Sequence, residues 1–197
     1  MVKIMPLFKI KYKLFFISLL SIFLSIDAPR LLADKSPLEK ISLEGFYVKE
    51  KLLNYYSERE ISNFLSDEEY IEIGISDLSQ FNYLNLIFEN NKRKGYPIVF
   101  LKGFINFSDN QKCLSRKDKI LNEISPSFNN DTLRRDDVLS DRTGKNQMFQ
   151  THIFLEYGDE IKLQCIDLDE QYKIETKDFE GFIFLVSTNR YSNFLNK

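Results

Sequence analysis

The sequence has no tryptophan, one histidine, two cysteines and only two alanines among its 197 residues. It also lacks a glycine-rich phosphate loop, a Cys-x-x-Cys pair, a His-Glu-x-x-His helix and a Gly-x-Ser-x-Gly turn. Its acidic clusters have neither the spacing nor the turn glycine of a calcium loop. These absences predict no metal site and no cofactor, and they exclude the enzyme classes that such motifs identify.

The N-terminal segment has the composition of an export signal. Four lysines and no acidic residue occur in the first thirteen positions, and an apolar stretch broken only by serines follows at 14–26. A basic segment before a short apolar one is typical of a signal peptide. The apolar stretch is shorter than the roughly 20 residues that a membrane-spanning helix needs. We therefore predict that residues 1–33 are a signal peptide, cleaved after Ala33, or a short N-terminal anchor where cleavage fails.

The remainder, residues 34–197, has the length of a single globular domain. Its apolar runs are too short to cross a bilayer, so we expect membrane contact only through an uncleaved N-terminal segment. The formal charge of −2 becomes about −6 once the leader is removed. Because a protein that follows nucleic-acid phosphates normally carries the opposite charge, we expect no nucleic-acid partner. The predicted location is periplasmic, lumenal or extracellular.

Helix and strand signals predict an α+β fold, with N-terminal helices packed on a mainly antiparallel sheet. Ser36-Pro37 is typical of a helix start, and Ser57-x-x-Glu60 and Ser66-x-x-Glu69 both match the capping-box pattern. Polar and apolar residues alternate at 71–75, which predicts a short strand.

Two later segments differ in how clearly they can be read. Residues 78–88 suit both a helix and a strand; we favour a helix, because their apolar side chains fall nearly all round a helical wheel. A strand at 96–107 follows, then a short helix at 114–124. The polar run at about 125–147 predicts a long loop, either a mobile functional loop or a disordered one.

The last fifty residues predict a C-terminal β-meander. Strand-like segments occur at 149–157, 161–168 and 179–186, separated by Gly158-Asp159 and by a polar run. The third segment is apolar on both faces, so we expect it to be central and covered on both sides.

The two cysteines, Cys113 and Cys165, predict a disulfide in an exported protein. The charge distribution supports this pairing. Residues 92–120 have a net charge of +6 and contain Cys113, whereas residues 156–180 have a net charge of −6 and contain Cys165. Opposite charges would orient the two segments toward each other, although exposed ion pairs contribute little energy individually.

A competing interpretation makes Cys165 a nucleophile with His152 as its base. It depends on the hairpin around Gly158-Asp159. A two-residue turn places His152 opposite Cys165, whereas a three-residue turn places Ile153 there and gathers the apolar side chains on one face. We favour the second register, because hydrophobic patterning usually fixes strand pairing.

Residues 92–120, the basic block, contain the candidate binding residues, which are Lys92, Arg93, Lys94, Arg116 and Lys117. With no catalytic motif present, these residues lead to the hypothesis of an exported non-enzymatic domain for binding or envelope assembly. Its partner would be an unknown protein or an anionic envelope component. The alternative is a small extracytoplasmic hydrolase, with the 125–147 loop over a cleft and His152 as general base.

Overall fold

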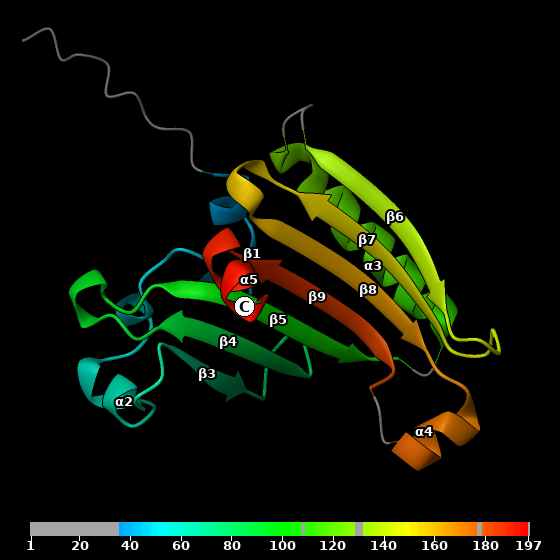
Figure 1. Cartoon of the computed structure of the whole chain (residues 1–197), viewed down its shortest axis with the longest axis horizontal. Coiled ribbons are helices and arrows are strands. Elements are labelled where there is room, and N and C mark those ends of the chain that lie inside the picture. Colours follow the sequence, from blue (N-terminus) through cyan, green and yellow to red (C-terminus); the bar gives the residue numbers. More distant parts are fainter. Residues whose placement is uncertain (1–35, 108, 129–131, 177–178, 197) are drawn as a thin grey trace, which may run out of the picture. The chain divides into compact units, whose positions relative to one another are not determined.

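A seven-stranded antiparallel sheet organises the chain in the computed structural model, which describes residues 36–107, 109–128, 132–176 and 179–196 (Figure 1). The predicted leader at 1–33 lies outside the described residues. The strand order is β3-β4-β5-β9-β8-β7-β6. The strands are β3 (Tyr70–Ile75), β4 (Tyr83–Glu89), β5 (Ile98–Asn106), β6 (Leu133–Ser140), β7 (Gln147–Phe154), β8 (Glu160–Asp167) and β9 (Gly181–Ser187).

Short elements and one long helix complete the fold. A two-stranded ribbon consists of β1 (Ser42–Leu43) and β2 (Phe46–Tyr47). The α-helices are α2 (Glu58–Ser62), α3 (Asn110–Ile124), α4 (Glu170–Thr176) and α5 (Asn189–Leu195). The 3-10 turns are η1 (Pro37–Lys40), η2 (Leu52–Asn54), η3 (Lys92–Lys94), η4 (Ser125–Ser127) and η5 (Glu156–Gly158). The mixed helix-and-sheet class predicted from the sequence is therefore confirmed.

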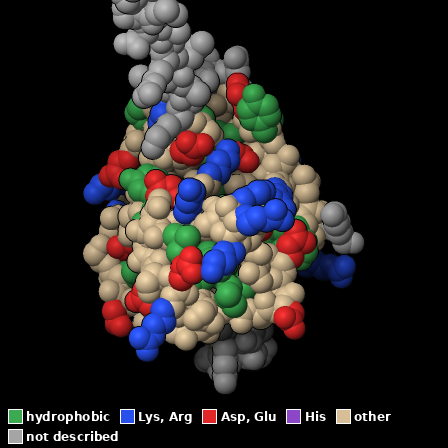
Figure 2. Space-filling model, turned by 90° about the vertical axis from the view of Figure 1, so that its left-hand side faces the viewer, with side chains coloured by type: hydrophobic (Ala, Val, Ile, Leu, Met, Phe, Trp, Pro, Cys, Tyr) green, Lys and Arg blue, Asp and Glu red, His purple; other side chains and the backbone are tan. Residues whose placement is uncertain are grey.

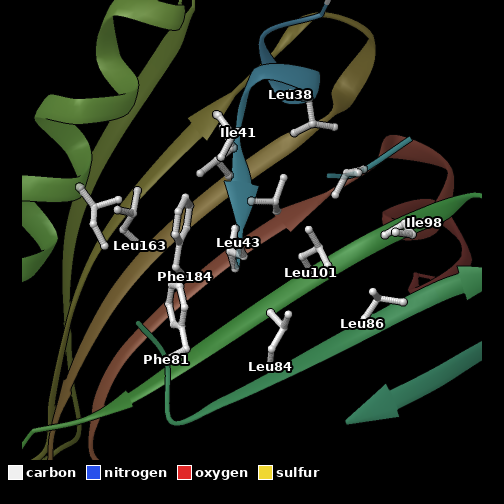
Figure 3. Packing of buried hydrophobic residues seen from close by; sticks show 14 of the residues in the cluster. Leu38, Ile41, Leu43, Phe81, Leu84, Leu86, Ile98, Leu101, Leu163 and Phe184 are labelled. Carbon is white, nitrogen blue, oxygen red and sulfur yellow. The ribbon is translucent and has the colours of Figure 1, made fainter. Parts of the chain in front are cut away.

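One face of the sheet carries the main hydrophobic core. The long helix α3 contacts β8 and β9 on this side. Over the other half of the sheet, Leu38, Ile41 and Leu43 reach toward Leu101 and Phe184 (Figure 3). The described N-terminal residues thus enter the core through short turns and the β1–β2 ribbon, while the long helix on the sheet comes from the middle of the chain.

The opposite face of the sheet is covered in part by α5. Tyr70, Phe100 and Tyr191 form a second, smaller apolar cluster there with Ile87 and Val99. The Tyr191 ring lies 5.3 Å from that of Tyr70 and 5.2 Å from that of Phe100, measured between centroids. A strand such as β4 therefore buries apolar side chains on both of its faces.

This burial on both faces explains why the prediction of a helix at 78–88 is wrong. Most of the segment forms β4, in which Leu84, Leu86 and Phe88 belong to the main core and Ile87 belongs to the second cluster. Because the second face of β4 mixes Tyr83 and Ile87 with Asn85 and Glu89, the segment has no purely polar face and its apolar residues also suit a helix. The strands predicted at 71–75 and 96–107 are confirmed as β3 and β5, and the helix at 114–124 as α3.

The prediction of a long loop at 125–147 is also wrong. It contains β6, an eight-residue strand paired with β7 along its whole length. Both faces of β6 are largely exposed, so its sequence lacks the alternation that marks a half-buried strand. Of the two predicted capping boxes, that of Ser57 is present at α2. Ser66 instead begins a bend, in which its hydroxyl accepts from the amide of Glu68.

The predicted meander is confirmed, because β7, β8 and β9 are antiparallel neighbours. Neither predicted register is present. Phe149 lies opposite Cys165, and His152 lies opposite Lys162. The turn is longer than expected because it includes η5, where Tyr157 and Gly158 have φ of 63° and 79°. Most of the apolar set expected on one face lies in the main core, namely Ile153, Leu155, Ile161, Leu163 and Cys165. Tyr157, which was expected with them, is instead 86% exposed.

Candidate functional site

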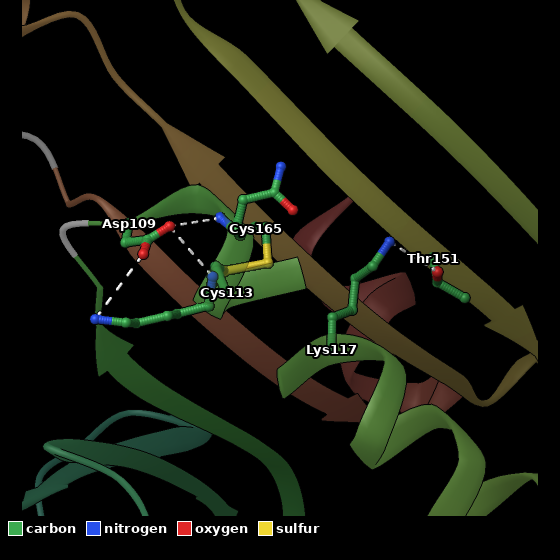
Figure 4. The surroundings of a disulfide bond; sticks show 7 residues. Asp109, Cys113, Lys117, Thr151 and Cys165 are labelled. Atoms are coloured by element: carbon green, nitrogen blue, oxygen red, sulfur yellow. Dashed lines mark hydrogen bonds and ion pairs between the residues drawn. A yellow bond between two sulfur atoms is a disulfide. The ribbon is translucent and has the colours of Figure 1, made fainter. Parts of the chain in front are cut away.

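The predicted disulfide joins Cys113 to Cys165, with 5.8 Å between the two Cα atoms (Figure 4). Asp109 caps α3 by accepting hydrogen bonds from the amides of Gln111 and Lys112, which fixes the helix start one turn before Cys113. Both cysteines are buried. Cys165 is therefore not a free thiol, and the interpretation of it as a nucleophile with His152 is wrong.

His152 lies on the opposite face of the sheet from the disulfide, in a polar network. Its Nε2 atom is 2.8 Å from Oε2 of Glu160, whose Oε1 accepts a hydrogen bond of 3.0 Å from Ser192. Ser192 is in turn 2.9 Å from the hydroxyl of Ser187. Burial is the main effect that lowers the pKa of His152 below its ordinary value of 6.5, against the opposing influence of Glu160.

Glu160 is the centre of this network. Burial raises its pKa, but Lys162, at 3.4 Å, and the hydrogen bonds from His152 and Ser192 lower it further, so the pKa lies below the ordinary value of 4.5. In a hydrolytic triad the histidine lies between the acid and the hydroxyl. Here the carboxylate occupies that middle position, so Ser192 donates to Glu160 and not to His152, and the order of the triad is absent from this network.

The five predicted binding residues lie on two separate elements. Lys92, Arg93 and Lys94 form η3, in the turn between β4 and β5 at the left of Figure 1, whereas Arg116 and Lys117 belong to α3 at the right. Lys117 is 3.5 Å from the hydroxyl of Thr151. The structure therefore does not gather the predicted residues into one patch.

The ion pairs expected between residues 92–120 and residues 156–180 are not found among the described residues. The described ion pairs of the basic block are made with Glu58, Glu89, Asp109 and Glu123, and all four lie outside residues 156–180. Packing of α3 against β8 and β9, and not charge pairing, brings Cys113 to Cys165.

A groove of about 520 Å³ lies where η3, the β7–β8 turn and the start of α5 meet, and it includes one of the predicted residues, Lys94. Its apolar lining includes Pro97, Ile98 and Val99, where the chain enters β5. The charged residues of its lining are Lys49, Glu89, Lys94, Asp159 and Arg190. Figure 2 views the molecule from the side of the β4–β5 turn and shows lysine and arginine side chains gathered near the middle of this face.

Lys49 is positioned by backbone pairing and by a buried carboxylate. Its amide donates to the carbonyl of Ile98 at 2.7 Å, which aligns residues 49–52 with the start of β5. Its Nζ atom lies 2.6 Å from Oδ2 of Asp159. The other oxygen of Asp159 accepts from the amide of Asn189, at the first turn of α5. Since Asp159 is only 4% exposed, the ammonium of Lys49 is held at a fixed place.

Arg190 is positioned in the same manner by Glu89, which is 5% exposed. Nη1 of Arg190 donates to Oε2 of Glu89 at 2.6 Å, and the side-chain amide of Asn91 donates to Oε1 at 3.0 Å. Lys94 lies 3.9 Å from the same carboxylate. The guanidinium is half-exposed, and it also contacts Tyr70 and Glu69, with its Nη2 atom 3.7 Å from Oε1 of Glu69.

Tyr157 forms the rim of the groove and is 86% exposed. Its φ of 63° is in the left-handed region, which is unfavourable for residues other than glycine. A large aromatic ring held in water by a strained backbone can contact a ligand over the apolar lining. The groove thus combines three cations and two buried carboxylates, a formal excess of one positive charge, with an exposed ring and apolar lining residues. This combination suits an anionic group attached to apolar or ring atoms.

Sequence reasoning missed most of this groove. Lys49, Glu89, Asp159 and Arg190 come from four segments, and no spacing in the sequence relates them. A partial signal was present in Gly158-Asp159, because an acidic residue directly after a turn glycine is well placed to cap a neighbouring element.

In the described part of the chain, no group of three or more histidine, cysteine, aspartate or glutamate side chains is arranged to hold a metal ion. No helix among those residues is both long and apolar enough to cross a membrane. Comparison with protein-family models, with curated proteins and with solved structures gave no match.

Proposed function

We propose that this chain is an exported, non-enzymatic binding domain of the cell envelope, and that its groove holds an anionic group of its partner. The observation that carries the proposal is the pair of buried carboxylates, Asp159 and Glu89, which fix Lys49 and Arg190 at the groove. Cations fixed before binding lose little side-chain freedom when an anion arrives.

Export is the other half of the proposal. It rests on the basic and apolar order of residues 1–33. The disulfide is compatible with it, because structural disulfides persist in oxidising compartments. Expression of the full chain in a secreting host, followed by mass measurement of the exported form, tests it. Removal of the leader near Ala33 is the expected result, and full-length protein recovered from the cytosol would contradict it.

The hydrolase alternative is not proposed, because no observation favours it. His152 is hydrogen-bonded to Glu160, and the neighbouring Ser192 donates to that same carboxylate.

Binding at the groove can be tested with a fluorescent hexaglutamate peptide as a carboxylate probe and with phosphatidylglycerol vesicles as a phosphate probe. Lys94→Glu is the variant of choice, since Lys94 is 57% exposed at its side chain and its contact with Glu89 is long. We expect it to weaken binding of the preferred probe at least fivefold, and added salt to weaken it further.

The matched control is Lys119→Glu, on the exposed surface of α3, where Lys119 makes only a 4.0 Å pair with Glu123. It changes the net charge by the same amount and should leave affinity within twofold. Equal loss in both variants would show nonspecific attraction, and the absence of binding to either probe would reject the groove as an anion site.

A further inference from the structure

Strand β6 is the last strand at one edge of the sheet, and its outer backbone groups have no strand to pair with in the described structure. It is long for an edge strand, with eight residues, and contains no proline. Its apolar side chains are well exposed: Leu133 is 64%, Val138 59% and Leu139 49% accessible. An exposed edge of this length and composition is a template for pairing with another strand.

The side chains on one face of β6 are arranged symmetrically along the strand. Alternate residues of a strand share a face, so Leu133, Arg135, Asp137 and Leu139 project on one side of the sheet. With Asp136 as the centre of the strand, Leu133 corresponds to Leu139, and Arg135 corresponds to Asp137. The strand is therefore complementary to a reversed copy of itself.

Only one register of such a pair uses this symmetry. Two copies of β6 can pair about a twofold axis that is perpendicular to the sheet. The residue at this axis then faces the same residue of the second copy. With Asp136 at the axis, Arg135 faces Asp137 of the second copy, and Leu133 faces its Leu139. A shift of the axis to Arg135 sets Leu133 against Asp137, and a shift to Asp137 sets Arg135 against Leu139, so neither keeps both the Leu–Leu and the Arg–Asp pairs.

The charges of this face already form pairs along the strand. Nε of Arg135 lies 2.7 Å from Oδ2 of Asp137. In the paired form each charge has one opposite neighbour on its own strand and one across the interface, which gives a square of alternating charges. β6 itself carries two arginines and two aspartates, so its approach to a second copy meets no net repulsion.

The other face of the strand accommodates the self-facing Asp136. Its carboxylate accepts from the hydroxyl of Thr151 at 2.6 Å and from Arg134 at 3.0 and 3.2 Å. Burial raises its pKa, but these hydrogen bonds and Lys117 lower it further, so the pKa lies below its ordinary value. The negative charge of Asp136 is thus balanced within its own chain, and Arg134 of each copy lies diagonally beside the opposing Asp136.

We propose that β6 is the pairing edge of a symmetric homodimer, in which two copies form one continuous antiparallel sheet with Asp136 at the twofold axis. Backbone hydrogen bonds supply the attraction, and the Leu and Arg–Asp pairs select the register. This inference is independent of the groove, and groove variants such as Lys94→Glu should leave the oligomeric state unchanged.

Single-cysteine cross-linking tests the register. In the full chain, Asp136→Cys should form a disulfide-linked dimer under mild oxidation, seen on a non-reducing gel, because Cβ atoms of directly facing residues lie about 5 Å apart. Arg135→Cys is the control: its two copies would be diagonal, about 7–8 Å apart, and should cross-link at least fivefold more slowly. Faster cross-linking of Arg135→Cys than of Asp136→Cys would overturn the register.

Charge reversal tests the dimer without new cysteines. Arg135→Asp or Asp137→Arg alone creates like-charge contacts at two symmetry-related places, so each should weaken dimerisation at least tenfold in sedimentation experiments. The double variant R135D/D137R restores opposite charges across the axis and should return to within threefold of the original. The proposal would be overturned by a wild-type chain that stays monomeric at 100 µM, or by a double variant that dimerises no more tightly than the single variants. A monomeric chain whose β6 binds a foreign peptide would overturn it as well.

Discussion

Glu89 and Arg190 are 101 positions apart in the sequence, yet Nη1 of Arg190 donates a 2.6 Å hydrogen bond to Oε2 of Glu89. The pair joins the end of β4 to α5. The carboxylate is buried and the guanidinium half-exposed, so loss of the cation leaves a buried charge with poorer compensation.

Arg190→Ala should therefore lower the free energy of unfolding by about 2 kcal/mol, less than for a fully buried pair because Asn91 and Lys94 still face Glu89. Chemical denaturation gives the value. The control is Lys92→Ala, which removes an exposed pair with Glu58 and should cost under about 0.5 kcal/mol. Equal effects of the two variants would show that Glu89 is not dependent on Arg190.

Replacement of both cysteines, C113A/C165A, should lower the stability by about 4 kcal/mol on the chain-entropy model, since the bond closes a loop across 52 positions. Guanidinium unfolding of the oxidised wild type and the double variant measures this difference. A loss below about 1 kcal/mol would contradict the chain-entropy value and would mean that the unfolded chain is already restricted without the bond.

The network of His152 and Glu160 should make stability fall with acid in two windows. The pKa of His152 is depressed in the folded state, so proton uptake favours the unfolded chain as the pH drops below about 6.5. The pKa of Glu160 is also depressed, so its contribution is present above about 4.5 and is lost as the pH falls through its folded value.

His152→Gln separates these windows, because His152 is the only histidine in the chain. We expect the variant to lose less stability than the wild type between pH 7.5 and 5, and a similar amount below pH 4.5. Unfolding free energies measured across pH 3–8 provide the comparison. An unchanged slope between pH 7.5 and 5 would contradict the depressed pKa of His152.

Replacement of Tyr157 tests whether its left-handed backbone lowers stability and whether its ring contributes to binding. Tyr157→Gly should leave stability unchanged or raise it by up to about 1 kcal/mol, because glycine adopts the left-handed conformation freely and the exposed ring packs little. The same change should weaken the probe binding described for the groove. The neighbouring Gly158→Ala should instead destabilise the fold, since φ is 79° and an added Cβ meets the side chain of Asn189. Stability lost on Tyr157→Gly would show that the ring contributes to packing.

The elements that sequence reasoning found share one property: a single environment along their length. β3 and β8 alternate between core and outside, and α3 has one buried stripe that includes Cys113 and Ile120. Such segments carry their period in the sequence. The disulfide followed from a count of two cysteines and required no knowledge of geometry.

The elements that it missed have two equal faces. β4 is buried on both sides and β6 is exposed on both, so neither has a contrast from which a period can be read. The hairpin register failed for another reason: η5 lengthens the turn through two consecutive left-handed residues, and the apolar pattern fixes only the face and not the offset. The groove was beyond reach because its ion pairs join distant segments.

The place of β9 in the sheet has a consequence for the order in which the domain can assemble. It is the last described strand along the chain, yet it lies between β5 and β8 and pairs with both. Until it pairs, β3, β4 and β5 have no strand pairing with β6, β7 and β8 among the described residues. A chain that emerges N-terminus first would therefore hold two unfinished sheets, each with an open inner border, and would need a final closing step when residues 181–187 slide between them.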